Sequence, residues 1–385
     1  MRKVAHYSPV YLSLTKTWLY AQVAHLKRFE PIVLCRRTEN VSQFPVKEIF
    51  SFRDSLSSFS RRYYRWRHGK DPYLRYYESV MKAQRPVLIH AHFGNCGHHI
   101  LPLAERLDLP LVTSFYGYDV SHLTQADPVW IERYKELFHG GKIFIVEGAH
   151  MGRMLESLGC PPEKIRIVRL GIDLARIPYR ERAAENEIRI LAAGSFREKK
   201  GHPFAIEAVG RIAQKHRNVS FTIIGDAAEH IPREAAEKKK ILAAIGRPGL
   251  SGRVRLLGYQ PYDVFIRELY EHHIFISPSV NAADGDNEGG APVSIIEASA
   301  SGMPIVSTKH CDIPEVVLDG VSGLLVAERD TEALADRLDH LCSHPDLWRE
   351  MGLAGRKHIE EDYDIHKQIP KLEDIYEYAA SGRIP

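Results

Sequence analysis

Residues 282–307, AADGDNEGGAPVSIIEASASGMPIVS, decide the fold of this chain. An apolar run, IFIS at 274–277, precedes this stretch, and a second apolar run, PIVS, ends it. Between the two runs lie an acidic loop, a Gly-Gly-Ala-Pro turn and an apolar helical segment. Pro292 suits the first position of a helix, and Gly302 is typical of a helix end. Two buried strands joined by a helix predict a crossover unit of a parallel sheet.

The same alternation of short apolar runs and longer helical stretches extends over the whole chain. The runs of the first half are 3–6, 32–36, 86–92, 111–115, 142–147 and 165–170. Those of the second half are 188–193, 220–225, 254–258, 274–278, 304–308 and 323–326. The pattern predicts an α/β protein with two doubly wound parallel-sheet domains, 1–175 and 186–362, that face a central cleft. A helix over 363–385 is expected to pack back on the first domain.

Length and composition exclude several classes of protein. A chain of 385 residues suits two domains, and 44% hydrophobic with 26% charged residues is ordinary for a folded protein. The sequence contains no run of 18 apolar residues, so it predicts no membrane-spanning helix. Residues 1–14 lack the apolar core of a secretory signal. Five separated cysteines without a Cys-x-x-Cys pair indicate neither a disulfide framework nor a zinc site. We therefore expect a cytoplasmic protein.

Positive charge gathers near the N-terminus. The net charge is only +3, but residues 1–85 hold 17 Lys and Arg against 6 Asp and Glu. Residues 51–82 combine eight of these basic residues with eight aromatic ones. This mixture favours an anionic membrane surface, here the inner face of the plasma membrane. Nucleic acid competes as a partner but is disfavoured because no nucleic-acid-binding module accompanies the stretch. An amphipathic helix packed on the domain, with a solvated charged face, is the alternative.

Several motifs are absent from the sequence. There is no G-x-G-x-x-G after the first strand, no P-loop, no His-Glu-x-x-His and no G-x-S-x-G. Histidine pairs occur at 90/92, 98/99 and 272/273, but no further ligand stands at metal-binding spacing. We expect neither a bound metal nor a cofactor.

The Gly-rich turn at 289–291 carries a specific chemistry. A turn that opens a helix presents backbone N–H groups and the positive end of the helix dipole, which suit a diphosphate. Glu297 follows about one turn into the helix, where a carboxylate can accept two hydrogen bonds from a ribose diol. A plain loop, with an acidic residue stabilised by the helix dipole, explains the same spacing.

With Glu288, this stretch resembles the signature of glycosyltransferase family 4, retaining enzymes of the GT-B fold. Its Gly-Gly-Ala-Pro turn is similar to the colanic-acid and amylovoran exopolysaccharide branch. The family separates its two glutamates by seven residues, whereas eight separate Glu288 from Glu297; the extra residue falls in the turn. The resemblance implies that Glu288 acts on the donor sugar and Glu297 binds the ribose. The other donor-binding residues expected in the second domain are Gly289, Gly290, Ala291, Pro292, Val293 and Tyr259.

The segment 192–209, AAGSFREKKGHPFAIEAV, resembles the family's strand followed by a Lys-Gly pair. The resemblance implies that Lys200 is catalytic and neutralises the donor diphosphate. Ser195 stands where the family usually has an arginine, so Arg197 is expected to supply that charge. Taken alone, the two lysines at 199 and 200 also fit a solvated helix start.

Two stretches of the first half, IHAHFGNCG at 89–97 and TSFYGYDVS at 113–121, resemble the acceptor-side loops of the family. Tyr116 replaces a family histidine, so with Gly117 it receives a positioning role. His92 and Asp119 are the catalytic candidates, although a satisfied strand-end histidine explains His92 equally well. SLTKTWLYAQ at 13–22 resembles the family's first helix start and places Thr17 on the acceptor side.

The resemblance implies a retaining transferase that moves a hexose from a UDP- or GDP-sugar to a lipid-linked or other oligosaccharide acceptor, without a metal. The alternative is a catalytically impaired sugar-nucleotide-binding assembly protein at the membrane. The departures at Ser195 and Tyr116 and the inserted residue favour that alternative. A phosphorylase-type activity lacks an identifiable lysine for a pyridoxal Schiff base.

Overall fold

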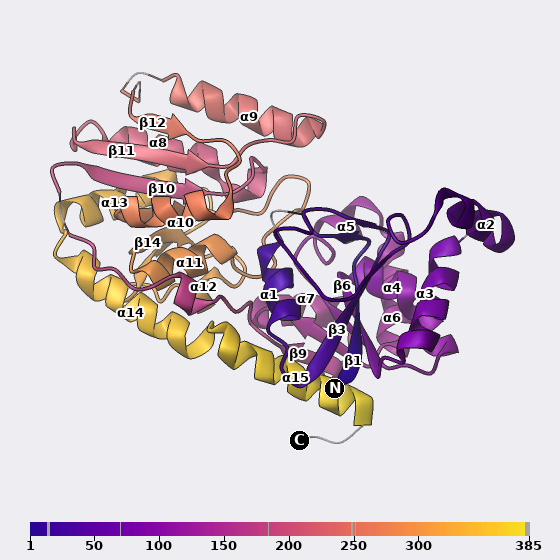
Figure 1. Ribbon diagram of the computed structural model, residues 1–385. Coiled ribbons are helices and arrows are strands. Elements are labelled where there is room, and N and C mark those ends of the chain that lie inside the picture. The colour runs from indigo at the N-terminus through magenta and orange to yellow at the C-terminus, as the bar shows by residue number, and fades with distance from the viewer. Residues whose placement is uncertain (14–15, 70, 184, 248, 251, 382–385) are drawn as a thin grey trace. The chain divides into compact units, whose positions relative to one another are not determined.

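The computed structural model describes residues 1–381 except 14, 15, 70, 184, 248 and 251. The chain divides into two compact units, Met1–Ile172 with Ile365–Pro385, and Asp173–Asp364 (Figure 1). The boundaries expected from the sequence are 175, 186 and 362. The end of the helix expected over 363–385 lies outside the described residues.

The first unit is built on a parallel sheet that has seven strands in the described part of the chain. Their order across the sheet is β5-β3-β1-β6-β7-β8-β9. The strands are β1 (Arg2–Tyr7), β3 (Phe29–Cys35), β5 (Ile49–Ser51), β6 (Leu88–His92), β7 (Leu111–Ser114), β8 (Ile143–Val146) and β9 (Ile165–Ile167). The strand order reverses beside β1, and ligands of open α/β sheets bind at the carboxyl ends of the strands near such a reversal.

Helices cover both faces of this sheet (Figure 1). They are α1 (Thr17–Ala24), α2 (Ser58–His68), α3 (Pro72–Gln84), α4 (Gly94–Arg106), α5 (His122–Ala126), α6 (Val129–Gly140), α7 (Ala149–Ser157) and α15 (Ile365–Ser381). On one face, Ile369, Leu372 and Tyr376 of α15 pack against the strands. On the other, Tyr77 of α3 and Ile100 of α4 belong to a second core. This double covering explains why a strand such as β8, IFIV, is continuously apolar.

Local differences from the predicted elements have simple causes. The sequence analysis did not predict β5, because a strand of three residues is too short to show a period. It also did not predict the two-residue strands β2 (Val10–Tyr11) and β4 (Arg37–Thr38). The stretch 51–82 contains α2, which ends at His68 with Gly69 as its C-cap, and most of α3, which begins at Pro72.

The second unit contains a parallel sheet of six strands within the described residues, ordered β12-β11-β10-β13-β14-β15. The strands are β10 (Ile188–Ala193), β11 (Val219–Ile224), β12 (Val254–Leu256), β13 (Ile274–Ser277), β14 (Ile305–Thr308) and β15 (Gly323–Val326). The helices are α8 (His202–Ile212), α9 (Pro232–Ile245), α10 (Tyr262–Glu271), α11 (Val293–Ser301), α12 (Ile313–Val316), α13 (Thr331–Ser343) and α14 (Leu347–Asp362). The prediction of an α/β protein with two doubly wound parallel sheets is confirmed.

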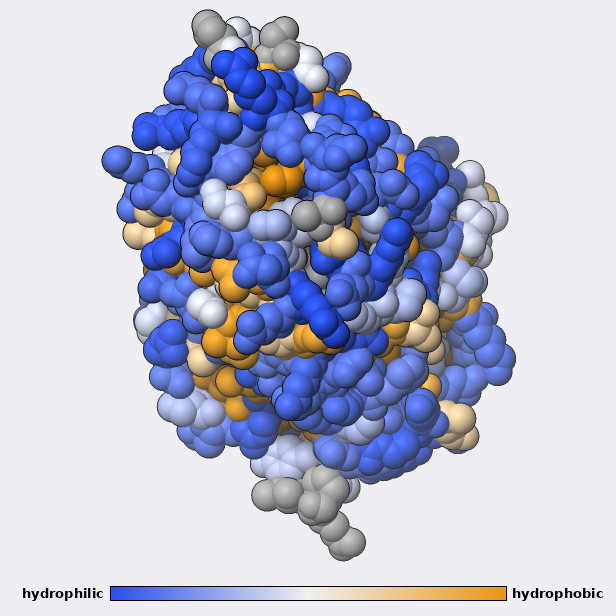
Figure 2. Space-filling view, turned by 90° about the vertical axis from the view of Figure 1, so that its left-hand side faces the viewer, coloured by the Kyte–Doolittle hydropathy of each residue, from blue (hydrophilic) through white to orange (hydrophobic). Residues whose placement is uncertain are grey.

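The apolar side chains of the second sheet are withdrawn from solvent. Ile190, Phe221 and Ile276 have no exposed surface and pack with Trp348 of α14. The face shown in Figure 2 is mostly hydrophilic, with hydrophobic side chains in small scattered patches. Of the helices described, none is long and apolar enough to cross a membrane.

Candidate functional site

The acidic loop between β13 and α11 brings Glu288 to Lys200. Nζ of Lys200 lies 2.9 Å from one carboxylate oxygen of Glu288 and donates a 3.0 Å hydrogen bond to the other. The hydroxyl of Ser279 donates to Glu288 as well, at 3.0 Å. The Glu288 side chain is only 6% exposed. The two residues that the sequence analysis assigned to chemistry on the donor are therefore a buried ion pair.

Gly201 allows the loop that carries Lys200 to approach β13 closely. Its φ is +65°, and a Cβ at this position would lie 1.9 Å from the carbonyl oxygen of Pro278. Both the left-handed conformation and the contact require glycine. The Lys-Gly pair noted in the sequence thus brings the backbone beside Lys200 close to Pro278, the residue that follows β13.

A second ion pair lies beside the first. Nζ of Lys199 is 3.2 Å from the carboxylate of Asp286 and donates a 2.7 Å hydrogen bond to the carbonyl of Asn287. Arg197 also donates to Asp286, and its Nε lies 4.0 Å from Glu234. Arg197, expected to supply charge to a diphosphate, is paired with these acids in the free protein. Ser195 is close by, and its carbonyl accepts the N–H of Arg197 at 2.8 Å.

Glu288 is held in its ionised form. Burial alone would raise the pKa of Glu288, but the charges of Lys200 and Lys199 outweigh burial and lower the pKa to about 2. Burial lowers the pKa of Lys200, and the carboxylate of Glu288 opposes that change. Oppositely charged neighbours favour the charged form of each partner, so the pair is ionised at neutral pH.

Glu297 lies in the second turn of α11 in a different environment. The hydroxyl of Tyr262 donates a 2.7 Å hydrogen bond to its carboxylate, and the guanidinium of Arg176 lies 5.0 Å from the Tyr262 ring centre. Burial raises the pKa of Glu297 to about 7, against the smaller opposing effects of Tyr262 and Arg176. Sequence reasoning missed both partners, since neither lies near Glu297 in the sequence.

His310 orients the backbone of the acidic loop. The N–H of Glu288 donates to Nε2 of His310 at 3.2 Å, so the ring carries its proton on Nδ1, which lies 2.7 Å from Glu328. His310 has no exposed side-chain surface. His310 follows β14, and β14 is the neighbour of β13 in the sheet. This position in the sequence could have indicated the contact between His310 and the loop after β13.

The Gly-rich turn leads directly into α11. Gly289 has φ +73°, Pro292 is the N-cap and Val293 is the first helical residue, one position later than predicted. Gly302 ends the helix in the left-handed region with φ +95°, as expected. Gly290 and Ala291 complete the turn. Tyr259 lies after β12 and is 50% exposed.

In the first unit, Asp119 ties together the two loops expected on the acceptor side. Its carboxylate accepts the N–H of Gly94 at 2.6 Å and the N–H of Tyr116 at 2.8 Å. Asp119 has no exposed surface, and burial raises its pKa to about 6 despite these hydrogen bonds. Gly117, with φ +63°, lies in the turn between Tyr116 and Asp119. The carboxylate of Asp119 thus holds the two loops together, and its catalytic role stays a prediction.

His92, Tyr116 and Trp18 form a contiguous group. Nδ1 of His92 and the hydroxyl of Tyr116 are hydrogen-bonded at 2.8 Å, and the ring centres of Tyr116 and Trp18 are 4.1 Å apart. Thr17, the first residue of α1, precedes Trp18. Residues 14 and 15 of the predicted 13–22 stretch lie outside the described residues.

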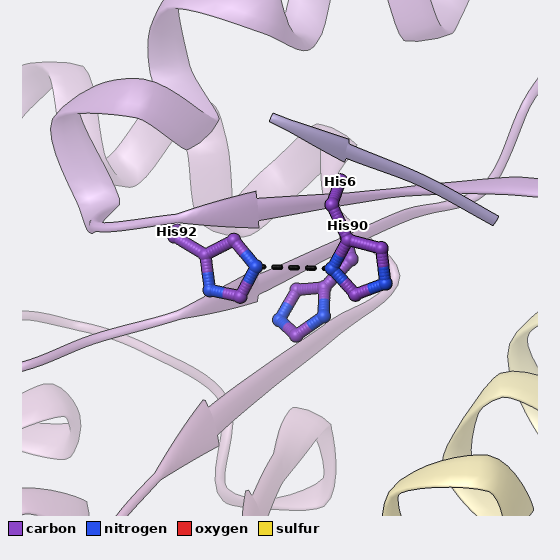
Figure 3. A group of neighbouring side chains, drawn as sticks. All are labelled: His6, His90 and His92. Atoms are coloured by element: carbon purple, nitrogen blue, oxygen red, sulfur yellow. Dashed lines mark hydrogen bonds between the residues drawn. The ribbon is translucent and has the colours of Figure 1, made fainter. Parts of the chain in front are cut away.

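Three buried histidines lie side by side at this edge of the sheet. His6 of β1 points toward His90 and His92 of β6, and Nδ1 of His6 is 3.1 Å from Nε2 of His92 (Figure 3). His90 is hydrogen-bonded to Tyr376 at 2.6 Å and to Ser114 at 2.8 Å. Burial lowers the pKa of His6 to about 3 and holds those of the other two well below the ordinary value, so all three rings are neutral. Sequence reasoning missed His6, although it is the strand partner of His90.

Comparison with known proteins identifies the family. Residues 17–176 match the family described as Glycosyltransferase Family 4, and residues 187–344 match Glycosyl transferases group 1. The amylovoran biosynthesis glycosyltransferase AmsK of Erwinia amylovora is 35% identical over 75% of this chain and 69% of its own length. The chain is a family 4 glycosyltransferase. The resemblance noted in the sequence is confirmed.

A second relative supports the family, and a solved structure supports the fold. The glycosyltransferase is 34% identical to the putative colanic acid biosynthesis glycosyltransferase WcaL of Escherichia coli, over 72% of the chain and 67% of WcaL. In fold it is similar to Anabaena HepE in complex with UDP-glucose, with a TM-score of 0.78 at 16% identity, covering 98% of the chain and 100% of HepE. The glycosyltransferase has the GT-B fold of two Rossmann-like α/β domains.

Proposed function

We propose that the protein moves a hexose from a UDP- or GDP-sugar to a hydroxyl of a lipid-linked oligosaccharide in surface-polysaccharide synthesis. The relatives AmsK and WcaL, named for amylovoran and colanic acid biosynthesis, support this class of product. The observation that carries the proposal is the Lys200–Glu288 pair, in which Nζ lies 3.0 Å from a carboxylate oxygen. Glu288 directly precedes the Gly-rich turn that leads into α11. A lysine held beside a Gly-rich helix start suits a departing diphosphate.

The proposed reaction retains the configuration of the sugar. The bond between C1 and the diphosphate oxygen breaks, the acceptor oxygen bonds to C1 from the same face, and the acceptor proton passes to an oxygen of the leaving diphosphate. Lys200, Arg197 and the N-terminus of α11 stabilise the charge that develops on the diphosphate, without a metal. Glu288 contacts the sugar and Glu297 the ribose. The protein contributes position and charge, so it needs no covalent nucleophile.

Turnover tests this proposal. The purified protein is incubated with UDP- and GDP-sugars and an acceptor extract, and the release of nucleotide is measured with and without a chelator. We expect release with one donor class and no loss on chelation. A strict requirement for magnesium or manganese would refute the metal-free reaction. Nucleotide binding without release would favour the alternative, an impaired assembly protein.

The membrane partner is proposed from residues 51–82. In α2, Phe59 is 82% exposed and Trp66 78%, and exposed aromatic rings beside arginines support docking on an anionic leaflet. Flotation with anionic vesicles at low salt tests the docking. We expect the protein to float and to be released as salt is raised, because the electrostatic contribution is screened. A protein that stays in the lower fraction at low salt would exclude this partner.

A further inference from the structure

A pocket lined by arginines lies within the first unit, apart from the residues assigned to the donor. Its volume is about 370 Å³, within the range of small-ligand sites. Five guanidinium groups line it: Arg36, Arg37, Arg53, Arg61 and Arg65. The rings of Phe52 and Tyr73 complete the wall.

The fold places this pocket at the carboxyl edge of the sheet. Arg36 follows β3 directly, and Arg53 follows β5 by one residue. The N–H of Arg53 donates to the carbonyl of Arg36 at 2.9 Å, which holds the two arginines side by side. His92 ends β6 on the same edge of the same sheet. The carboxyl edge is where open parallel sheets bind their ligands.

Much of the positive charge in this pocket is not neutralised by the contacts described. Nε of Arg36 is buried and has no hydrogen-bond partner among the described residues, while its guanidinium lies 4.5 Å from the Tyr73 ring centre. Arg61 donates to the carbonyl of Arg53 and to the hydroxyl of Ser58, both neutral groups. Arg37 forms an ion pair with Glu39 at 2.8 Å. A buried donor without an acceptor is costly, although another nitrogen of Arg36 lies 3.3 Å from Nε2 of His99. With four further arginines in the lining, the pocket favours a ligand that supplies several anionic oxygens.

Helix α2 presents two different faces. Arg61 and Arg65, four residues apart, line the pocket. Phe59, Tyr63 and Trp66 follow the i, i+4, i+7 spacing of another face and are 82%, 49% and 78% exposed. At about 100° per residue, these rings lie roughly 100–160° around the helix from Arg61 and Arg65, so they face away from the pocket and suit the bilayer that holds the apolar chain of an anionic lipid.

We propose that the arginine pocket binds the diphosphate of a lipid-linked acceptor, whose apolar chain stays in the bilayer on which Phe59, Tyr63 and Trp66 dock. This inference rests on the proposed transferase function for the role of that ligand as acceptor. Guanidinium groups bind phosphate oxygens in a bidentate manner, and a diphosphate offers enough oxygens for several of them. The pocket then holds the acceptor by the group that its lipid carrier provides.

Calorimetric titration of the full chain with geranyl diphosphate, inorganic diphosphate and geraniol tests the proposal. Arg36→Gln and Arg65→Gln should each weaken binding of geranyl diphosphate about tenfold or more, the effect of a lost charged hydrogen bond. Arg62→Gln and Arg67→Gln are matched controls, because they remove the same charge from α2 outside the pocket. They should change the affinity less than about twofold. Unchanged binding in the first two variants, or equal loss in the controls, would overturn the proposal.

Two further variants separate the possible sources of the phosphate and the two sites. Trp66→Ala should weaken binding to vesicles that contain a polyprenyl diphosphate and leave binding of inorganic diphosphate unchanged; wild-type binding to these vesicles that is no stronger than to vesicles without the lipid would overturn the lipid part. Lys200→Ala should lose nucleotide binding and keep geranyl diphosphate. If the wild type binds geranyl diphosphate but no nucleotide, the proposed function fails while the pocket stands.

Discussion

The two buried polar clusters of this glycosyltransferase balance their charges in different ways. In the second unit, Lys200 and Glu288 form an ion pair, and so do Lys199 and Asp286. In the first unit, the carboxylate of Asp119 accepts hydrogen bonds from the backbone N–H groups of Gly94 and Tyr116, and burial keeps His92 of the same unit neutral. One cluster is stabilised by opposite charges and the other by hydrogen bonds.

This difference matches the chemistry proposed for each side. A mobile lysine can exchange a carboxylate for a diphosphate without leaving an unpaired charge, so a charged cluster suits a charged donor. Neutral rings and hydroxyls suit the hydroxyl groups of an acceptor sugar. Substitutions in the second unit should therefore change nucleotide binding and transfer, whereas those in the first should change acceptor binding.

The largest effect is expected for Lys200→Gln. The substitution leaves the buried carboxylate of Glu288 without its nearest cation, which costs about 3–5 kcal/mol in the free energy of unfolding. Transfer should fall by about a hundredfold or more, because the charge on the departing diphosphate is no longer opposed. Chemical denaturation and initial rates measure the two effects. The double variant Lys200→Gln/Glu288→Gln should recover most of the stability and none of the rate.

A surface pair supplies the matched control for Lys200→Gln. Lys215 pairs with Asp339 at 2.8 Å but is 64% exposed, so Lys215→Gln should cost less than about 1 kcal/mol in the free energy of unfolding.

The pH dependence of the wild-type stability has a defined sign. The pKa of Glu288 in the folded protein is lowered to about 2, so its ionised pair stabilises the fold above about pH 4.5. That stability should be lost as pH falls from about 4.5 toward 2 in the wild type, and less so in Lys200→Gln.

Asp119→Ala is the corresponding test in the first unit. It leaves the buried N–H groups of Gly94 and Tyr116 without an acceptor, which we expect to cost about 2–4 kcal/mol together. Thermal unfolding measures the loss. The affinity for the donor nucleotide should stay within about twofold of the wild type. A variant as stable as the wild type would show that the carboxylate does not hold the two loops.

Glu297→Ala should weaken binding of the preferred nucleotide by about 1.5–3 kcal/mol, the value of a hydrogen bond to a charged group. The physical reason is the loss of the acceptor proposed for the ribose hydroxyls. Calorimetry with the nucleoside diphosphate measures the change. Glu297→Gln keeps one acceptor oxygen and should lose less. An unchanged dissociation constant in the alanine variant would exclude the ribose contact.

Tyr116→Phe should have the smallest effect, a loss of about 0.5–1.5 kcal/mol in stability together with a higher KM for the acceptor. The hydroxyl is hydrogen-bonded to His92 at 2.8 Å, on the side proposed for the acceptor. Tyr134→Phe is the control, because its hydroxyl donates to the carbonyl of Asp119 at 2.8 Å in the same unit. The control should lose similar stability and keep its KM. Equal KM values in both variants would remove Tyr116 from acceptor binding.

The fold was predictable because apolar strand runs and helix stops are local signals. Gly302 ends α11 where it was expected, and Lys200 and Glu288, both assigned to the donor from the sequence, form an ion pair. Missed features depend on contacts between distant segments. His6 reaches His92 across the sheet, and Tyr262 reaches Glu297 from α10. The three residues of β5 are too few to show the alternation that predicts a strand. The pocket lined by Phe52 and Arg53, which follow β5, could therefore not be predicted either.

The proposed donor site can be tested most directly by the pH dependence of nucleotide binding. UDP and GDP are titrated into the wild type and Glu297→Gln between about pH 6 and about pH 8. Burial raises the pKa of Glu297 to about 7, and ribose hydroxyls donate to its ionised form. The wild-type affinity for one nucleotide, relative to the variant, should therefore rise with pH through about 7 and then level. No binding of either nucleotide, or the same pH profile in both proteins, would contradict the account.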